Sequence, residues 1–249
     1  LLWVGGPALE TLPGTWFSMV CNRGGRIFDA NMKPEMGPGS IAREALQYFQ
    51  DSFLKHEIAD PDSLNLKFMP AVKVFNTGNH LYLGTFHNYF MNQLNDPAQS
   101  PIAGKAKIHP LPGEGKTLAV TWYYMMSEAT RDREWAWKML QYLGGRTKDG
   151  AYTQAVSLAK SSMLYPGFTS VAESPEIREA WSSRVDVDVL QGIFANGVNY
   201  EKVVPAVTQP WYSKWNEQLN LELTACLKGE ITVDQACDNI AAAVDRVKG

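Results

Sequence analysis

Residues 113–117, Gly-Glu-Gly-Lys-Thr, are the first candidates for chemistry because they match the end of a phosphate-binding loop. That loop needs a glycine five positions before its Gly-Lys-Thr, where this sequence has Pro110. A proline has no backbone N–H to donate to a phosphate. We therefore interpret residues 113–117 as a turn and not as a nucleotide site.

The remaining reactive side chains do not form a catalytic or metal-binding pattern. Asp186 and Asp188 alternate with valines, so on an extended segment both would point to the same face, whereas a sugar hydrolase places its carboxylates on opposite sides of the substrate. The sequence has no Gly-x-Ser-x-Gly motif and no cysteine in a nucleophile context. The four histidines lack metal-ligand spacing: His56, His80, His87 and His109. We predict no enzyme activity, no metal and no cofactor.

Composition narrows the class of protein further. The 249 residues are 45% hydrophobic, which suits a folded globular chain. The net charge of -3 shows no excess of basic residues of the kind expected in a protein that binds nucleic acid. The longest apolar stretch, 118–126, is too short to cross a bilayer, so no transmembrane segment is predicted. Leu1 is neither an initiator Met nor part of a signal peptide, so we expect that any signal peptide was removed or lies outside this sequence.

Strand-like and helix-like segments alternate, which predicts an α/β architecture. One short apolar strand or helix is expected over 16–21. Strand-like patterns cover 68–90 and a buried strand is expected over 118–126. Apolar periodicity and capping residues predict helices over 41–53, 88–94, 131–143 and 151–158, and from Ser174 onward.

The last fifty residues give the clearest pattern. An apolar stripe from Trp211 to Leu227 ends before Gly229. Thr232 and Gln235 form a capping box for a final helix with an apolar seam. We predict that the two helices, near 211–228 and 232–247, pack antiparallel through these stripes.

Several segments, in this order, resemble the family 1 extracellular solute-binding proteins (maltose-binding-protein-like) of ABC importers. The segment 227–236, Leu-Lys-Gly-Glu-Ile-Thr-Val-Asp-Gln-Ala, is similar to the C-terminal end of that family. Residues 135–143, Phe75-Asn76-Thr77-Gly78 and 22–29 resemble three further family segments. Family members begin with an N-terminal lobe that has no counterpart in these 249 residues.

The resemblance implies a periplasmic-binding-protein-like (type II) fold of two α/β lobes, mostly the C-terminal lobe here. Residues 1–120 would form the first part of that lobe, 121–172 would return to the N-terminal lobe, and 173–249 would supply closing helices. The implied function is extracytoplasmic binding of a carbohydrate or related polyol and its delivery to ABC permease subunits by hinge closure, in the periplasm or outside the cell. The alternatives are a carbohydrate-active hydrolase or lyase and a non-transport ligand-sensing module.

The aromatic surplus of 8 Trp, 10 Tyr and 10 Phe favours a carbohydrate, because a sugar ring stacks its C–H face on an aromatic ring. Four places align with ligand-contacting loops of the family, and we expect at least three of them to line one cleft. The predicted ligand-binding residues are Thr15, Trp16, Phe86, His87, Asn88, Tyr89, Trp122, Tyr123, Trp211 and Trp215.

The cysteines allow two interpretations. If the last two helices pair, Cys226 and Cys237 come within bridging reach in an oxidising compartment, which predicts a disulfide with Cys21 left free and buried. The alternative is that all three are small buried side chains.

Overall fold

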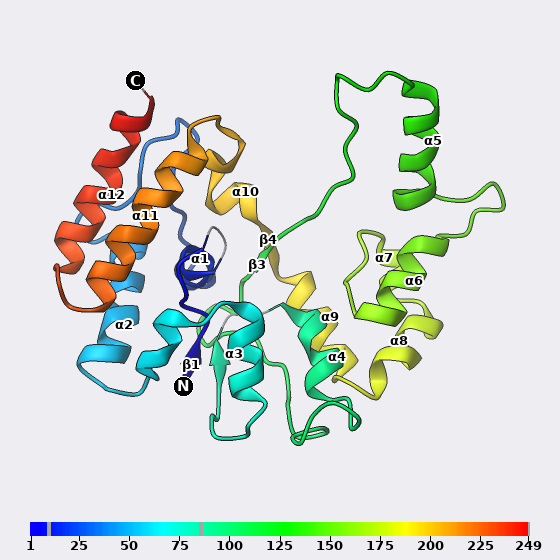
Figure 1. Cartoon of the computed structure of the whole chain (residues 1–249), viewed down its shortest axis with the longest axis horizontal. Coiled ribbons are helices and arrows are strands. Elements are labelled where there is room, and N and C mark those ends of the chain that lie inside the picture. Colours follow the sequence, from blue (N-terminus) through cyan, green and yellow to red (C-terminus); the bar gives the residue numbers. More distant parts are fainter. Residues whose placement is uncertain (9–10, 85–86, 249) are drawn as a thin grey trace. The chain divides into compact units, whose positions relative to one another are not determined.

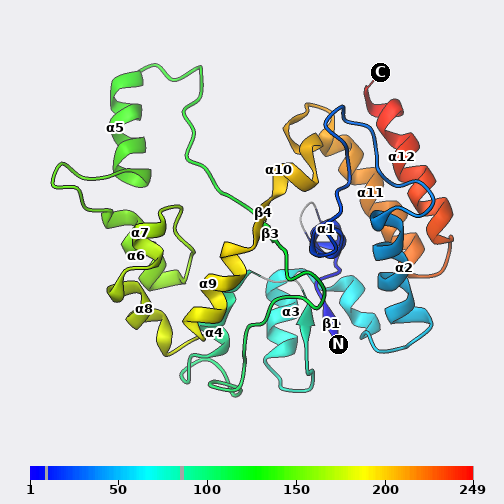
Figure 2. The same ribbon diagram turned by 180° about the vertical axis from the view of Figure 1, so that it is seen from behind.

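The computed structural model describes residues 1–8, 11–84 and 87–248, which divide into two compact units. Unit 1 comprises Leu1–Phe86, His109–Val120 and Gly192–Gly249, and unit 2 comprises His87–Ile108 and Thr121–Gln191. Figures 1 and 2 show the ribbon from opposite sides. The assignment of 1–120, 121–172 and 173–249 to the lobes of a larger fold stays a prediction.

Unit 1 is built mainly from four helices. These are α1 (Leu12–Asn22), α2 (Ile41–Leu54), α11 (Tyr212–Leu227) and α12 (Val233–Lys248). Their apolar faces share one core, in which Trp16, Phe49 and Trp215 are fully buried. Helices α11 and α12 lie side by side and are joined by a short turn, as Figure 1 shows, so the predicted antiparallel pair is confirmed.

Local capping explains where these helices begin. The Ser40 hydroxyl accepts a hydrogen bond from the backbone N–H of Arg43, so α2 starts where the sequence predicts. Thr232 and Gln235 form the predicted capping box. The Thr232 hydroxyl accepts from the Gln235 backbone N–H, and the Gln235 amide oxygen accepts from the Thr232 backbone N–H.

The strands are short and form two parallel pairs. β1 (Leu2–Trp3) pairs with β2 (Leu83–Gly84), and β3 (Thr117–Ala119) pairs with β4 (Gly197–Asn199). The smaller elements of unit 1 are η1 (Pro61–Asn65), α3 (Phe68–Phe75), α10 (Tyr200–Val203) and η3 (Pro205–Thr208).

Unit 2 is helical. Its elements are η2 (Asn88–Phe90), α4 (Met91–Leu94), α5 (Arg133–Gly144), α6 (Thr153–Ser162), α7 (Thr169–Ala172) and α8 (Pro175–Ser182); α9 (Val187–Ala195) continues from unit 2 into unit 1. Trp181 is fully buried, and its indole N–H donates to the Ala159 carbonyl 2.8 Å away, which ties α8 to α6. No helix in the described part of the chain is long and apolar enough to cross a membrane.

Three predicted elements are corrected. Residues 68–75 form helix α3 and not a strand, because Ala71, with Phe68 and Phe75 on the same helical face, packs against Leu2 and Val4. The predicted buried strand 118–126 is formed only up to Ala119, and the rest is exposed. Asp186 does not lie on a strand, since its carboxylate accepts from the backbone N–H groups of residues 188 and 189 and so caps α9.

Candidate functional site

An aromatic cluster in unit 2 joins two of the four predicted places. The rings of His87 and Tyr89 stack, with centroids 5.2 Å apart and planes 11° from parallel. Trp122 approaches both rings, at 6.4 Å from His87 and 6.5 Å from Tyr89. Residues about 35 positions apart in sequence therefore form one aromatic surface, which we name the aromatic cluster: His87, Tyr89, Phe90 and Trp122.

The cluster has a buried base and an exposed rim. Phe90 is 3% exposed and lies 4.4 Å from the Tyr89 ring, so the start of α4 anchors the cluster in unit 2. Trp122 is 65% exposed and follows β3 on an extended segment. An exposed indole beside stacked rings offers an apolar face of the kind that packs on a sugar.

Polar groups next to the rings could pair with hydroxyls. Burial lowers the pKa of His87, so at pH 7 its imidazole is mainly neutral. The Asn88 side-chain nitrogen donates to the Met163 carbonyl at 2.6 Å, so this nitrogen is already used within unit 2. Tyr123 is 63% exposed on the same segment as Trp122. Phe86, also predicted, lies outside the described residues.

The prediction that Thr15, Trp16 and Trp215 contact a ligand is wrong. Trp16 and Trp215 are fully buried, and their indole N–H groups donate to the Ala42 and Ile240 carbonyls, each at 3.0 Å. Thr15 is 1% exposed and its hydroxyl donates to a carbonyl at 2.7 Å. These side chains connect the helices of unit 1.

Trp211 has a structural environment of its own in unit 1. Its ring lies 6.0 Å from the Phe28 ring, and the Lys248 ammonium stands 5.1 Å above it. The ring is only partly buried and packs against the unit 1 core. A ligand contact by Trp211 stays a prediction.

The predicted disulfide is not present. Cys21, Cys226 and Cys237 are all free and buried. The Gln50 amide donates to the Cys226 sulfur at 3.4 Å, and burial raises the pKa values of Cys226 and Cys237 to about 12 and about 11. Disulfide formation needs a thiolate, which is scarce at such pKa values. The interpretation as small buried side chains is the one that the structure supports.

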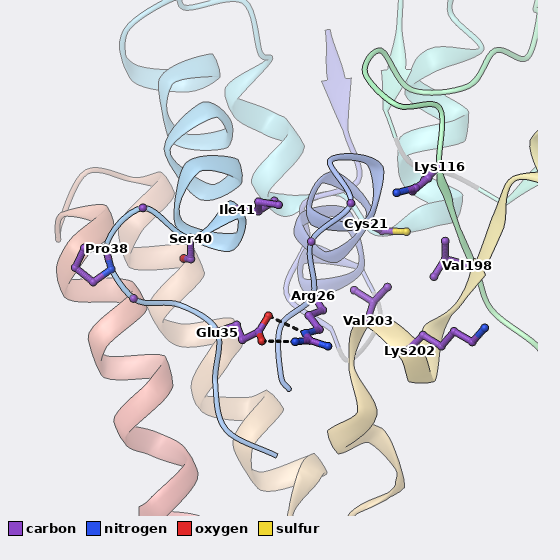
Figure 3. A pocket seen from close by; sticks show the side chains of 14 residues that line it. Cys21, Arg26, Glu35, Pro38, Ser40, Ile41, Lys116, Val198, Lys202 and Val203 are labelled. Atoms are coloured by element: carbon purple, nitrogen blue, oxygen red, sulfur yellow. Dashed lines mark hydrogen bonds and ion pairs between the residues drawn. The ribbon is translucent and has the colours of Figure 1, made fainter. Parts of the chain in front are cut away.

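A pocket in unit 1 was not predicted from the sequence (Figure 3). It has a volume of about 730 Å³ and lies between the end of α1, the start of α2 and β4. Arg26 on its wall is neutralised by Glu35 through two hydrogen bonds of 2.7 and 2.8 Å, and Lys116 by Glu114 at 2.7 Å. None of the described residues that line it is aromatic. The glycines at 24, 25, 37 and 39 were the available signal, since small residues leave room at a surface.

The two sites differ in what they can bind. The unit 1 pocket offers two ion pairs, the ammonium of Lys202 and backbone but no stacking face, whereas the aromatic cluster offers a stacking face with a mainly neutral imidazole beside it. In the described part of the chain, no group of histidine, cysteine and acidic side chains could hold a metal ion. The aromatic cluster is therefore the stronger candidate for a neutral, hydroxyl-rich ligand.

Comparison with known structures gives the class of fold. Maltose-bound MalE3 of T. maritima matches with a TM-score of 0.79 and 23% identity, over 99% of this chain and 60% of that chain. A solute-binding protein of an ABC transporter from Agrobacterium radiobacter K84, in complex with ribitol, matches with a TM-score of 0.74 and 18% identity, over 99% of this chain and 59% of that chain. One from Thermotoga lettingae TMO, bound with alpha-D-tagatose, matches with a TM-score of 0.74 and 17% identity, over all of this chain and 59% of that chain.

These matches show that the chain has the fold of the solute-binding proteins of ABC transporters, the type II periplasmic-binding-protein-like fold, over nearly its whole length. The chain spans about 60% of the length of the structures it matches. No protein-family model matches the sequence, and no curated protein matches it.

Proposed function

We propose that this chain contributes to the capture of a carbohydrate or polyol for an ABC importer. The observation that supports the proposal is the fold, shared along 99% of the chain with proteins solved with maltose and with ribitol. The aromatic cluster adds the chemistry, because an exposed indole next to a neutral imidazole suits a ring or chain of hydroxylated carbons.

The residues of the aromatic cluster would have different roles in binding. Trp122 would stack on the apolar face of the ligand, and the rings of His87 and Tyr89 would border the same site. Tyr89 would hold the imidazole by the stacking already present. Binding rather than catalysis follows, because none of these groups is a carboxylate pair or an activated nucleophile.

A role in an importer also implies partners, a location and a conformational change. Delivery would require permease subunits as partners, a location in the periplasm or outside the cell, and closure of two lobes around the ligand. Residues 1–120 and 173–249 would belong to one lobe, and 121–172 to the other.

Calorimetric titration with maltose, ribitol, tagatose and mannitol tests the proposal. The expected result is binding of at least one of these ligands, weakened about tenfold by Trp122→Ala, which corresponds to about 1.4 kcal/mol. Trp135→Ala is the matched control, because Trp135 is 67% exposed and Trp122 65%, while Trp135 contacts Lys138 instead of the cluster. Equal effects of the two variants would reject Trp122 as the stacking residue, and no heat with any of the four ligands would reject the ligand class.

A further inference from the structure

A short segment of unit 2, residues 87–94, carries most of the aromatic cluster. It contains η2 and α4, and its apolar side chains, among them Phe90 and Leu94, are buried. Apolar burial is not directional, so it keeps the segment in unit 2 without fixing how the His87 and Tyr89 rings lie at its start. Their position needs a directional contact as well.

Two asparagine side chains join this segment to the end of α6. The Asn88 amide donates to the Met163 carbonyl at 2.6 Å, and the Asn92 amide donates to the Ser161 carbonyl at 3.1 Å. The last carbonyls of a helix have no partner within the helix, so they are available to accept from such side chains. Hydrogen bonds are directional, and Asn88 stands in the sequence between the two residues whose rings stack.

The residue that accepts from Asn88 has a strained backbone. Met163 follows α6 with φ 53° and ψ 25°, in the left-handed region. This conformation is unfavourable for a residue with a side chain, and helix ends of this kind usually carry glycine. Met32 and Glu57 also have positive φ, but neither is fully buried, whereas Met163 is 1% exposed. Such strain persists only where the surrounding structure holds it, and it is concentrated at functional sites.

The left-handed turn at Met163 is firmly supported. Its backbone N–H donates to the Ala159 carbonyl at 3.0 Å, and the residue itself is buried in unit 2. The indole N–H of Trp181 donates to the same Ala159 carbonyl at 2.8 Å, which ties α8 to this turn. The Met163 carbonyl therefore belongs to a turn that α6, α8 and the interior of unit 2 hold in place, and it offers Asn88 a fixed acceptor.

We infer that Asn88 is a positioning residue: its hydrogen bond to the Met163 carbonyl fixes the start of η2 and so holds the His87 and Tyr89 rings where Trp122 approaches them. The inference rests on the proposed function of the aromatic cluster. A stacking surface made of rings from two segments binds more tightly when the rings are already in place, because less side-chain freedom is lost on binding. Asn88 acts through the rings, since its amide nitrogen is bound to the end of α6.

Asn88→Ala tests the inference without any ligand. An NMR titration follows the imidazole of His87, which is one of only four histidines in the chain. Burial lowers the pKa of His87, so an imidazole that leaves its place and gains water should titrate closer to the ordinary value of about 6.5. We expect the pKa of His87 to rise in Asn88→Ala. Asn92→Ala is the matched control, because it removes the same kind of hydrogen bond to a nearby α6 carbonyl at a position that does not adjoin the rings.

An unchanged pKa of His87 in Asn88→Ala would overturn the inference. An equal rise in Asn92→Ala would also overturn it, because it would show a general loosening of unit 2.

Calorimetry with a sugar or polyol that the unmodified chain binds adds a second measurement. Affinity should fall about three- to tenfold in Asn88→Ala and stay within about twofold in Asn92→Ala. A loss of affinity in Asn88→Ala with an unchanged pKa of His87 would assign Asn88 to direct ligand contact and overturn its positioning role. If the chain binds none of the ligands, the titration of His87 still decides the inference, so its failure is distinguishable from a failure of the proposed function.

Discussion

Arg43→Met should destabilise unit 1 strongly, because Arg43 connects three segments. Its guanidinium donates to the carboxylates of Asp234 at 2.5 Å and Asp238 at 2.6 Å on α12. It also donates twice to the carbonyl of Met36, at 2.9 and 3.0 Å, just before α2. Methionine keeps the apolar stem and removes all of these hydrogen bonds.

The cost follows from the exposure of the partners. The side chains of Asp234 and Asp238 are 75% and 72% exposed, so each ion pair contributes at most about 1 kcal/mol. Met36 is 1% exposed, and its carbonyl would lose both of its bonds to the guanidinium, which costs about 1–3 kcal/mol. We expect a loss of about 2–3 kcal/mol in the free energy of unfolding.

Urea denaturation followed by tryptophan fluorescence, with hydrogen exchange of α12, measures this loss. Arg26→Met is the control: Arg26 makes two hydrogen bonds to Glu35, but the two side chains are 51% and 37% exposed, so its loss should be clearly smaller than that of Arg43→Met. In 1 M salt the part of the stability difference that comes from the ion pairs should disappear, and the part that comes from the hydrogen bonds to Met36 should remain. The reasoning would be refuted if the two variants lost the same unfolding free energy. It would also be refuted if 1 M salt made the stabilities of Arg43→Met and the unmodified protein equal.

Three further predictions concern local groups. Thr232→Ala should cost about 1 kcal/mol in the free energy of unfolding and raise exchange in the first turn of α12, since it removes the capping hydroxyl. The hydrogen bond from His80 is the largest cause that lowers the pKa of Asp60. This contribution to stability is present above the ordinary pKa of about 4 and is lost as the pH falls through the lowered folded value, so Asp60→Asn should flatten the acid limb of a stability–pH curve. Burial raises the pKa of Cys226 to about 12, so a thiol reagent at pH 8 should modify it only after unfolding.

Each of these has an opposing outcome. A Thr232→Ala variant with unchanged exchange in α12 would show that packing alone holds the helix start. An acid limb of equal slope in Asp60→Asn would assign the acid sensitivity to other carboxylates. Rapid labelling of Cys226 in the folded protein would contradict its burial.

The elements that the sequence predicts well are fixed by interactions between residues that are close in sequence. Ser40 caps α2 and Thr232 caps α12 through bonds that span three residues, so the residues alone contain the necessary information. The pairing of α11 with α12 follows from two adjacent apolar stripes and a short turn. Helix α3 was missed because its apolar residues suit a strand equally well, and packing against β1 decides between them.

The candidate site was harder to predict because residue type does not determine exposure. Trp16 and Trp122 are the same residue type, yet one is fully buried and the other is 65% exposed. Trp16 packs into the core of unit 1, where the Ala42 carbonyl, 26 residues away in sequence, accepts its indole N–H. The approach of Trp122 to His87 spans a similar separation, and no local pattern encodes it.

The incorrect prediction of a buried strand over 118–126 has a different cause. The residues do carry the pattern of a buried strand, and the pairing begins as expected where Leu118 matches Val198 in β4. It stops at Ala119, because β4 ends at Asn199 and the described chain supplies no other strand beside the following residues. The residue pattern therefore specifies strand propensity, whereas a formed strand also needs a neighbouring strand to pair with, and the described chain provides one only up to Ala119.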